Sequence, residues 1–337
     1  AAVTGYANID NTDVATTVHP FTQMGINKVH TYTDGTNYLT GVGQTIHIAD
    51  FNCNTNLDIY DNKTILNLDD GDAGESTFQD DNGTPVNWHC NAVATFAAGD
   101  ANTNTSAKFR GVAPDADLVL SSIPDTEGTF SADDFGRDLD AARTAGAIAS
   151  NHSWGQNEDT NSDGDNDSAK EADEFLAFYN LNKASFTMDQ IAGNFYDGRS
   201  LTSGQTSSWQ TFITALDNFQ STGVIVFANG NWVNDGDASW LAALPSFYKG
   251  GTDQLGNTLE DLTDAWISVN FADFTGADMV NITESEFVLK GNPCGSAREY
   301  CLTVDDFGVN HSSYYDETDG TNYLHTGQNG SSYGAPM

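Results

Sequence analysis

Short apolar runs alternate along the chain with longer segments of helical spacing. The short runs are rich in β-branched residues and are bounded by Gly, Asn and Asp, which is typical of buried strands; they span 45–49, 116–120, 147–149 and 224–227. Small and apolar residues recur at helical spacing in 91–98, 131–146 and 208–220. Strands that alternate with helices predict an α/β fold of three layers, with a central, mainly parallel sheet flanked by helices.

The alternation continues without an internal repeat or a linker, so residues 1–337 are interpreted as one domain. One stretch, at about 156–204, is polar and acidic and interrupts the rhythm. We interpret it as a surface insertion within that domain.

Polar residues follow three of the predicted strands. Asp50 ends the first, 151–153 (Asn-His-Ser) ends the third, and 229–231 (Asn-Gly-Asn) ends the fourth. The carboxyl ends of parallel strands meet at one edge of a sheet, where loops carry functional groups into a shared crevice. These strand ends are therefore the candidate functional positions.

The charge balance limits the choice of partner. The chain has 12 Lys and Arg against 48 Asp and Glu, a formal net charge of −36, which repels nucleic acid and anionic membrane surfaces. No apolar run reaches the roughly 18 residues that a membrane span needs. The first residues lack the basic and apolar segments of a secretory signal, so we expect a mature, exported protein.

Four cysteines fall into two pairs, Cys294 with Cys301 and Cys53 with Cys90. An even number of cysteines and Asn- and Thr-rich loops favour disulfides and an oxidising, extracellular compartment. The alternative is four buried free thiols, and the spacing alone does not decide between the two.

The segment 330–337 reads Gly-Ser-Ser-Tyr-Gly-Ala-Pro-Met. It places Ser332 between small residues, as at the start of a tightly packed helix. A serine hydroxyl becomes a nucleophile only where a histidine takes its proton and a carboxylate orients that histidine. Ser332 as a nucleophile therefore requires both partners elsewhere in the chain.

Several motifs resemble, in their order along the chain, those of the subtilases, a family of serine peptidases. They are the strand and Asp at 41–50, Gly-Val-Ala-Pro at 111–114, Asn-His-Ser-Trp-Gly at 151–155 and Ala-Asn-Gly-Asn at 228–231. The resemblance covers the chain from near its start to Ser332. It implies the subtilisin-like fold and hydrolysis of protein or peptide substrates.

The same resemblance implies a role for each site residue. Ser332 would be the nucleophile, His89 the general base and then acid, and Asp50 the carboxylate that fixes the histidine tautomer. The side-chain amide of Asn231 would donate to the developing oxyanion, a contribution of roughly 3 to 4 kcal/mol at such sites. The extended substrate would lie beside Ser153, Trp154 and Gly155.

The segment 292–302, with Cys294 and Cys301, resembles a Cys-Gly…Cys-Leu loop of the autotransporter-type subtilases. This resemblance suggests an enzyme attached to, or released from, a bacterial surface. In subtilases the nucleophile begins a long buried helix, whereas this sequence ends at Met337. We therefore expect further polypeptide after Met337 in the native protein.

The sequence also departs from the family pattern. Phe51 and Asn52 follow Asp50 where the family has a hydroxyl residue and Gly, and 86–92 differs from the His-Gly-Thr-His-Val-Ala-Gly motif around the histidine. These changes motivate an alternative function, a catalytically impaired protease-like binding or surface structural protein. Two other histidines near the motifs, His47 and His152, are interpreted as structural.

A calcium site is the second chemical hypothesis. Oxygen-bearing side chains occur at every second position of an acidic loop that contains a glycine, namely at Asp159, Asn161, Asp163, Asp165 and Asp167. A tight loop of this pattern wraps a hard cation such as structural Ca²⁺. The alternative is a solvated acidic loop, in which the close carboxylates repel one another.

Overall fold

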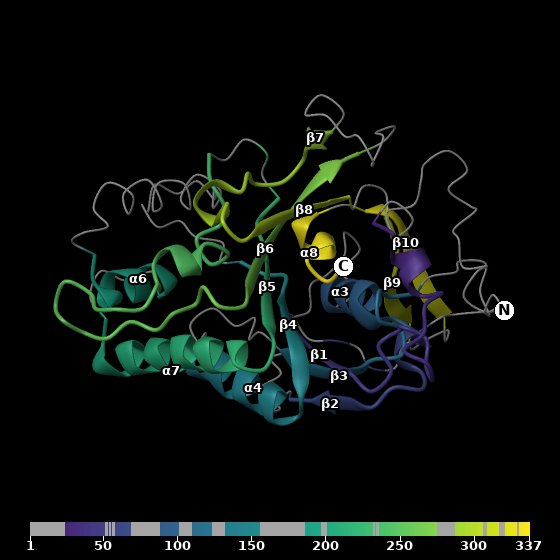
Figure 1. Cartoon of the computed structure of the whole chain (residues 1–337), viewed down its shortest axis with the longest axis horizontal. Coiled ribbons are helices and arrows are strands. Elements are labelled where there is room, and N and C mark those ends of the chain that lie inside the picture. The colour runs from purple at the N-terminus through teal and green to yellow at the C-terminus, as the bar shows by residue number, and fades with distance from the viewer. Residues whose placement is uncertain are drawn as a thin grey trace.

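A mainly parallel sheet forms the centre of the protein in the computed structural model (Figure 1). The structure describes residues 24–50, 53, 55, 58–68, 88–100, 110–122, 132–155, 186–196, 201–231, 233, 236–274, 287–305, 309–316, 321–328 and 330–337. Within these ranges the sheet has eight strands in the order β2-β3-β1-β4-β5-β6-β7, and β8 also pairs with β6. Every pairing is parallel except that of β7 with β6. The strands are β1 (Thr45–Asp50), β2 (Ile65–Asn67), β3 (Asp117–Ser122), β4 (Ala147–His152), β5 (Val224–Ala228), β6 (Trp266–Asp273), β7 (Val288–Leu289) and β8 (Cys301–Asp305).

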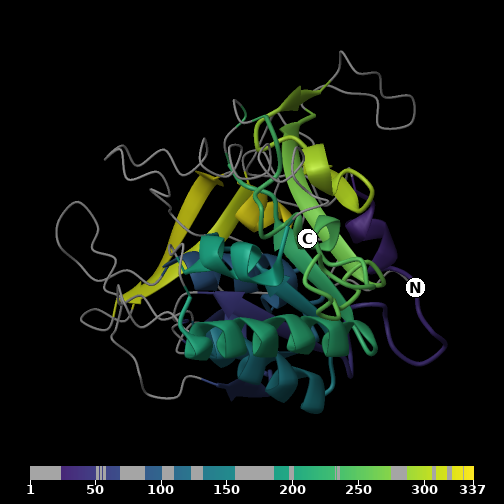
Figure 2. The same cartoon turned by 90° about the vertical axis from the view of Figure 1, so that its left-hand side faces the viewer.

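Helices cover both faces of this sheet, as Figures 1 and 2 show. On one face lie α4 (Ala132–Thr144), α6 (Met188–Phe195) and α7 (Ser203–Gln220), and on the other lie α3 (Trp88–Ala98) and α8 (Ser331–Gly334). The predicted three-layer α/β architecture is therefore confirmed. The remaining elements are α2 (Ile26–Val29), the 3₁₀ turns η1 (Asp58–Tyr60), η2 (Leu244–Ser246) and η4 (Gly295–Ala297), and the antiparallel pair β9 (Val309–Asp316) and β10 (Thr321–Gln328).

Side chains of β1 point alternately to the two faces of the sheet, so this strand contributes to the packing on both. Ile46 and Ile48 pack with the apolar cluster under α3, which includes Val93. Successive side chains of a strand point to opposite faces, so His47 lies on the other side of the sheet. The strand then ends at Asp50, whose side chain is buried.

Helix α7 begins five residues before the predicted start at 208, because Thr202 and Gln205 form a capping box. The Gln205 backbone N–H donates to Thr202 Oγ1 at 3.2 Å, and the Thr202 N–H donates to Gln205 Oε1 at 2.9 Å. Trp209, Phe212 and Phe219 lie on the buried face of the helix. The spacing of these apolar residues predicts the helix from 208 onward. The polar first turn, which precedes 208, is helical because of the capping box.

The segment interpreted as an insertion, 156–204, is only partly described. Residues 156–185 and 197–200 lie outside the described residues. Within the rest, α6 follows Phe186 and buries Ile191 and Phe195 in the same core cluster as Trp209 of α7. This part of the segment belongs to the main core.

The strand order places the candidate positions at one edge of the sheet. β1 lies between β3 and β4, and β5 and β6 continue on the side of β4. Because these strands are parallel, Asp50, His152 and Ala228 all stand at carboxyl ends. A ligand-binding crevice is expected at such an edge, where the direction of strand order changes.

Candidate active site

Asp50 and His89 come from different elements and meet at the edge of the sheet. Asp50 is the last residue of β1, and His89 lies in the first turn of α3. The His89 Nδ1 atom is 2.8 Å from Oδ1 and 3.0 Å from Oδ2 of Asp50. The carboxylate is fully buried, whereas the imidazole keeps 20% of its side chain exposed. The Nδ1 atom of His89 therefore faces the carboxylate of Asp50, and part of the imidazole is accessible to solvent.

This contact sets the protonation of His89. An ionised carboxylate only accepts hydrogen bonds, so Nδ1 carries the proton and the neutral ring has its lone pair on Nε2. Burial lowers the pKa of His89, but the charge of Asp50 and the hydrogen bond to it raise the pKa, and the net result is a pKa above 6.5. The pair thus combines a fixed tautomer with a strengthened base.

Ser332 lies in the short helix α8, which packs against α3. The ring of Tyr333 lies 6.1 Å from that of His89 and 5.5 Å from that of Phe96, measured between centroids. The Ser332 hydroxyl donates to the Ser153 carbonyl at 3.1 Å, and the residue as a whole is 9% exposed. The three predicted triad residues are therefore carried by β1, α3 and α8 at the same end of the sheet.

Asn231 is held by the residue that precedes Ser332. Its Oδ1 accepts from the backbone N–H of Ser331 at 2.8 Å and from the Ser331 hydroxyl at 2.9 Å. Because the backbone N–H is only a donor, the atom facing it must be the amide oxygen, which leaves Nδ2 available as a donor. Gly330 has φ 157° and a Cβ there would lie 3.3 Å from Asn231 Oδ1, so this approach favours glycine.

The predicted substrate-binding segment begins beside Ser332. The Ser153 hydroxyl donates to the Ser332 carbonyl at 2.9 Å and accepts from Asn151 Nδ2 at 2.8 Å. Trp154 is buried and its ring stacks on Phe135 at 4.8 Å, whereas Gly155 is exposed. Ser153 and Trp154 thus face the protein interior, and the segment reaches the surface at Gly155.

Both predicted cysteine pairs are disulfides in the structure. Cys53 is joined to Cys90 with a Cα–Cα distance of 5.1 Å, and Cys294 is joined to Cys301 with a Cα–Cα distance of 5.8 Å. Cys90 is the residue after His89. The first disulfide therefore ties the segment that follows Asp50 to the helix that carries the histidine.

His47 and His152 form a separate network inside the sheet. His47 Nδ1 is 2.8 Å from the Ser150 hydroxyl and its Nε2 is 2.9 Å from that of Ser121, while His152 Nε2 is 2.9 Å from Ser150 Oγ. Both residues are 1% exposed. Burial lowers the pKa of His47 to about 3, and burial is also the main reason that the pKa of His152 lies well below 6.5. Neutral, enclosed rings of this kind are structural, as the sequence indicates.

The predicted calcium ligands Asp159, Asn161, Asp163, Asp165 and Asp167 lie outside the described residues. Across the described ranges, no group of three or more His, Cys, Asp and Glu side chains is arranged to hold a metal ion. In the same ranges no helix is both long enough and apolar enough to cross a bilayer.

Sequence reasoning missed Tyr60 and did not reveal the structural roles of Asn229 and Asn292, which lie near the site. Tyr60 donates to Asn91 Oδ1 at 3.0 Å, and burial together with the charge of Asp50 raises the pKa of its phenol. Asn229 and Asn292 hold the segment that carries Asn231. No local pattern marks Tyr60, whereas the position of Asn292 two residues before a cysteine of a closed loop was an available signal.

Comparison with known proteins identifies the protein family of this chain. The model of the Subtilase family, Peptidase_S8, matches residues 25–337. Among curated proteins, no sequence matches significantly.

Solved structures share the fold at low sequence identity. The structure of the PatG macrocyclase in complex with a peptide is 12% identical, with a TM-score of 0.52 over 95% of this chain and 80% of that one. Fervidolysin from Fervidobacterium pennivorans, described as a keratinolytic enzyme related to subtilisin, is 14% identical, with a TM-score of 0.52 over 93% of this chain and 37% of that one. Both are similar to this chain in fold.

Proposed function

The chain belongs to the subtilase family of serine peptidases, and on this basis we propose that it is a secreted endopeptidase whose catalytic triad is Asp50, His89 and Ser332. The contact between His89 Nδ1 and the buried carboxylate of Asp50, at 2.8 Å, is the observation that carries the proposal. A structural histidine has no need of a buried anion, whereas a general base gains orientation and basicity from one.

The proposed reaction begins with proton transfer from Ser332 to His89. Ser332 Oγ now donates to the Ser153 carbonyl, and it turns to donate to His89 Nε2. Oγ then bonds to the carbonyl carbon of the substrate, Nε2 takes the hydroxyl proton, and the imidazolium is stabilised by Asp50. His89 returns this proton to the leaving amine, which leaves an acyl group on Ser332. Water hydrolyses the acyl-enzyme with His89 as base.

The position of Asn231 also supports the proposal. Its Oδ1 is bound to Ser331, so its Nδ2 is the atom free to serve as a donor near Ser332. A preorganised donor at the developing oxyanion lowers the barrier because no reorganisation is needed during the reaction.

The test of the proposed function is labelling by a fluorophosphonate, which reacts with an activated serine. We expect one label per wild-type chain and none on Ser332→Ala, together with peptide hydrolysis that is lost in the same variant. Cleavage within folded or denatured protein substrates distinguishes an endopeptidase from an exopeptidase. A folded wild-type protein without label or hydrolysis would instead favour the alternative, a catalytically impaired protease-like binding or surface structural protein.

We also propose a structural calcium site in the loop 159–167, from its sequence pattern alone. A cation bound only by the folded protein raises the melting temperature. Chelation is therefore expected to lower the melting temperature, and added Ca²⁺ to restore it. An unchanged melting temperature would refute the calcium site and leave the proposed peptidase unaffected.

The proposed location is outside the cell or at a bacterial cell surface, and the proposed subfamily is the autotransporter type. The disulfides Cys53–Cys90 and Cys294–Cys301 support an oxidising compartment. The likeness of the loop 292–302 to the autotransporter-type loop supports the subfamily. Fractionation of expressing cells, with detection of the protein in the medium or on the surface, is the direct test.

A further inference from the structure

Asn229 connects the end of β5 to the loop that precedes the second disulfide. Its Nδ2 donates to the carbonyl oxygens of Asn292 at 3.0 Å and Pro293 at 2.7 Å, and its Oδ1 accepts from the Ser268 hydroxyl at 2.8 Å. The residue is completely buried. A buried amide with this many partners fixes the relative position of the segments that it joins, because breaking one bond leaves a polar group unpaired.

Asn292 in turn contacts Gly230, the residue between Asn229 and Asn231. The Asn292 N–H donates to the Gly230 carbonyl at 3.1 Å, and its side-chain Nδ2 donates to the Asp237 carbonyl at 3.1 Å. Gly230 has φ 108°, and a Cβ on it would overlap the Asn292 side-chain amide. The amide of Asn292 therefore lies directly against the backbone that carries Asn231.

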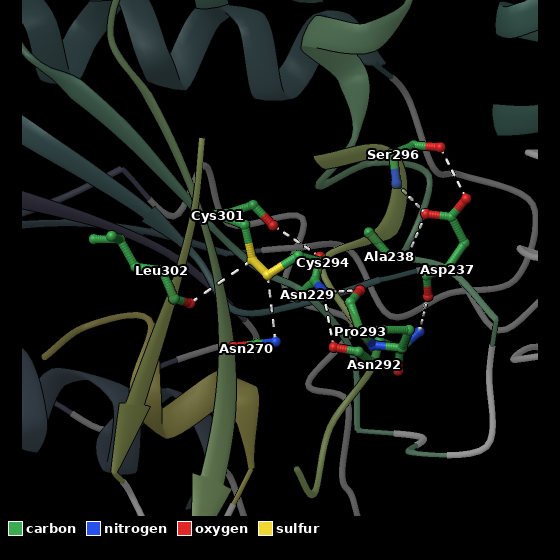
Figure 3. The surroundings of a disulfide bond; sticks show 11 residues. Asn229, Asp237, Ala238, Asn270, Asn292, Pro293, Cys294, Ser296, Cys301 and Leu302 are labelled. Carbon is green, nitrogen blue, oxygen red and sulfur yellow. Dashed lines mark hydrogen bonds between the residues drawn. A yellow bond between two sulfur atoms is a disulfide. The ribbon is translucent and has the colours of Figure 1, made fainter. Parts of the chain in front are cut away.

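The disulfide Cys294–Cys301 closes the same loop, as Figure 3 shows. Cys301 is the first residue of β8, so the bridge anchors the loop to the central sheet. The Asp237 carboxylate accepts from the Ser296 N–H and from its hydroxyl, the latter at 2.8 Å. The loop is thus held by a covalent bond at one side and by the partly buried carboxylate of Asp237 at the other.

The side chain of Asn231 is exposed, so its own packing does little to orient it. Its position depends on Ser331 and on the conformation of Gly230. Oxyanion donors act through preorganisation, and a displacement of about 1 Å can lower a rate about 100-fold. A fixed conformation of Gly230 should therefore affect the rate, even though Asn292, which packs against Gly230, touches no reacting atom.

We propose that Asn292, held by Asn229 and by the disulfide Cys294–Cys301, is a positioning residue for the oxyanion donor Asn231, and that loss of this disulfide slows the acylation step. The inference rests on the proposed function, since it assumes that Asn231 binds the oxyanion. It adds a second, redox-sensitive determinant of rate that lies outside the triad.

The test is a double-mutant cycle on peptide hydrolysis with wild type, Asn292→Ala, Asn231→Ala and the double variant. We expect Asn292→Ala to lower kcat about 10- to 100-fold and to leave KM within about twofold, since the ground state is bound elsewhere. In the Asn231→Ala background, the same substitution is expected to have little further effect on kcat. Equal losses in both backgrounds, or a change confined to KM, would show that Asn292 is only structural.

The variant Cys294→Ala/Cys301→Ala removes the covalent anchor without altering Asn292, and it serves if Asn292→Ala does not fold. We expect a loss of kcat that again disappears in the Asn231→Ala background. Asn257→Ala is the matched control. Asn257 is an exposed asparagine whose side chain bonds Asp253, four positions away, so the substitution should leave kcat unchanged.

The outcomes separate this inference from the proposed function. Hydrolysis that survives in Ser332→Ala overturns the proposed triad. A large loss in Asn231→Ala, with wild-type kcat in both Asn292→Ala and the cysteine variant, overturns only the positioning role. A loss of kcat in those two variants that depends on Asn231 supports both.

Discussion

Ser153 and Ser332 are joined by two reciprocal hydrogen bonds, each from the hydroxyl of one residue to the carbonyl oxygen of the other, at 2.9 and 3.1 Å. The two residues are 179 positions apart in the chain. Their bonds fasten the proposed nucleophile to the end of β4, and so to the rigid centre of the sheet.

Replacing Ser153 with alanine should therefore destabilise the protein. The substitution removes the hydroxyl that donates to Ser332 and leaves the buried amide of Asn151 without that acceptor. We expect the free energy of unfolding to fall by about 1 to 3 kcal/mol in a urea titration. The control is Ser221→Ala, whose exposed hydroxyl bonds only locally. A loss no greater than that of the control would show that the bonds of the Ser153 hydroxyl contribute nothing.

The pair of Asp50 and His89 predicts a specific pH dependence. His89 acts as a base only when it is neutral, and its pKa is raised above 6.5, so kcat/KM should rise with pH through a midpoint above 6.5. Asp50→Asn removes the charge that raises this pKa, so the midpoint should move to lower pH while kcat falls by about 10⁴-fold. Steady-state kinetics from pH 5 to 9 measure both effects. An unchanged midpoint would mean that Asp50 does not control the histidine.

His47 and His152 predict a loss of stability in weak acid. Burial lowers both pKa values, to about 3 for His47, so these rings stay neutral in the folded protein while the unfolded chain binds protons below about pH 6.5. The free energy of unfolding should then fall with decreasing pH, by up to about 1.4 kcal/mol per pH unit for each histidine.

Urea titrations of the wild type and of His47→Gln between pH 7 and 5 test this effect, because most carboxylates stay ionised in that range and His89 is present in both proteins. His47→Gln retains groups that can bond Ser121 and Ser150 but takes up no proton, so the pH dependence should become shallower. If the variant and the wild type lose stability equally, buried histidine is not the cause.

The two disulfides should differ in their contribution to stability. Cys53–Cys90 has a sequence separation of 37, and Cys294–Cys301 has one of 7. A disulfide restricts the unfolded chain more when its loop is longer, which predicts losses of about 4 and about 2.5 kcal/mol on replacing each pair with alanine. Thermal melting of both double variants without reductant gives the comparison. A larger loss for the Cys294–Cys301 pair would contradict this ranking.

Local pattern was sufficient to predict the strands that lie in the middle of the sheet. β1, β3, β4 and β5 were all identified within two or three residues of their ends, because each is a short apolar run between turn residues. β6 (Trp266–Asp273) was not predicted, since its polar Asn270 and Ser268 break the apolar run. Both side chains are buried, and the hydroxyl of Ser268 is bonded to Asn229, a partner that the local sequence does not reveal.

The start of α3 also depends on tertiary partners that the local sequence does not reveal. The spacing of small residues predicted a helix from 91, whereas the helix begins at Trp88 and includes His89. Its first turn is positioned by the disulfide of Cys90 and by the contact of His89 with Asp50. Both interactions join the helix to residues about forty positions earlier, beyond the reach of helical periodicity.

The sequence by itself determined the layered α/β fold, the family and the strand end at which Asp50 stands, because these follow from short-range periodicity and from motifs in a fixed order. Only the tertiary structure decided which polar atoms meet: the bonds of Ser153 with Ser332, of Ser331 with Asn231, and of Asn229 with the loop at Asn292. Each joins residues 63 or more positions apart, where the partner depends on how the whole chain packs. Burial then makes each of these bonds matter, since an unpaired polar group inside the protein is costly.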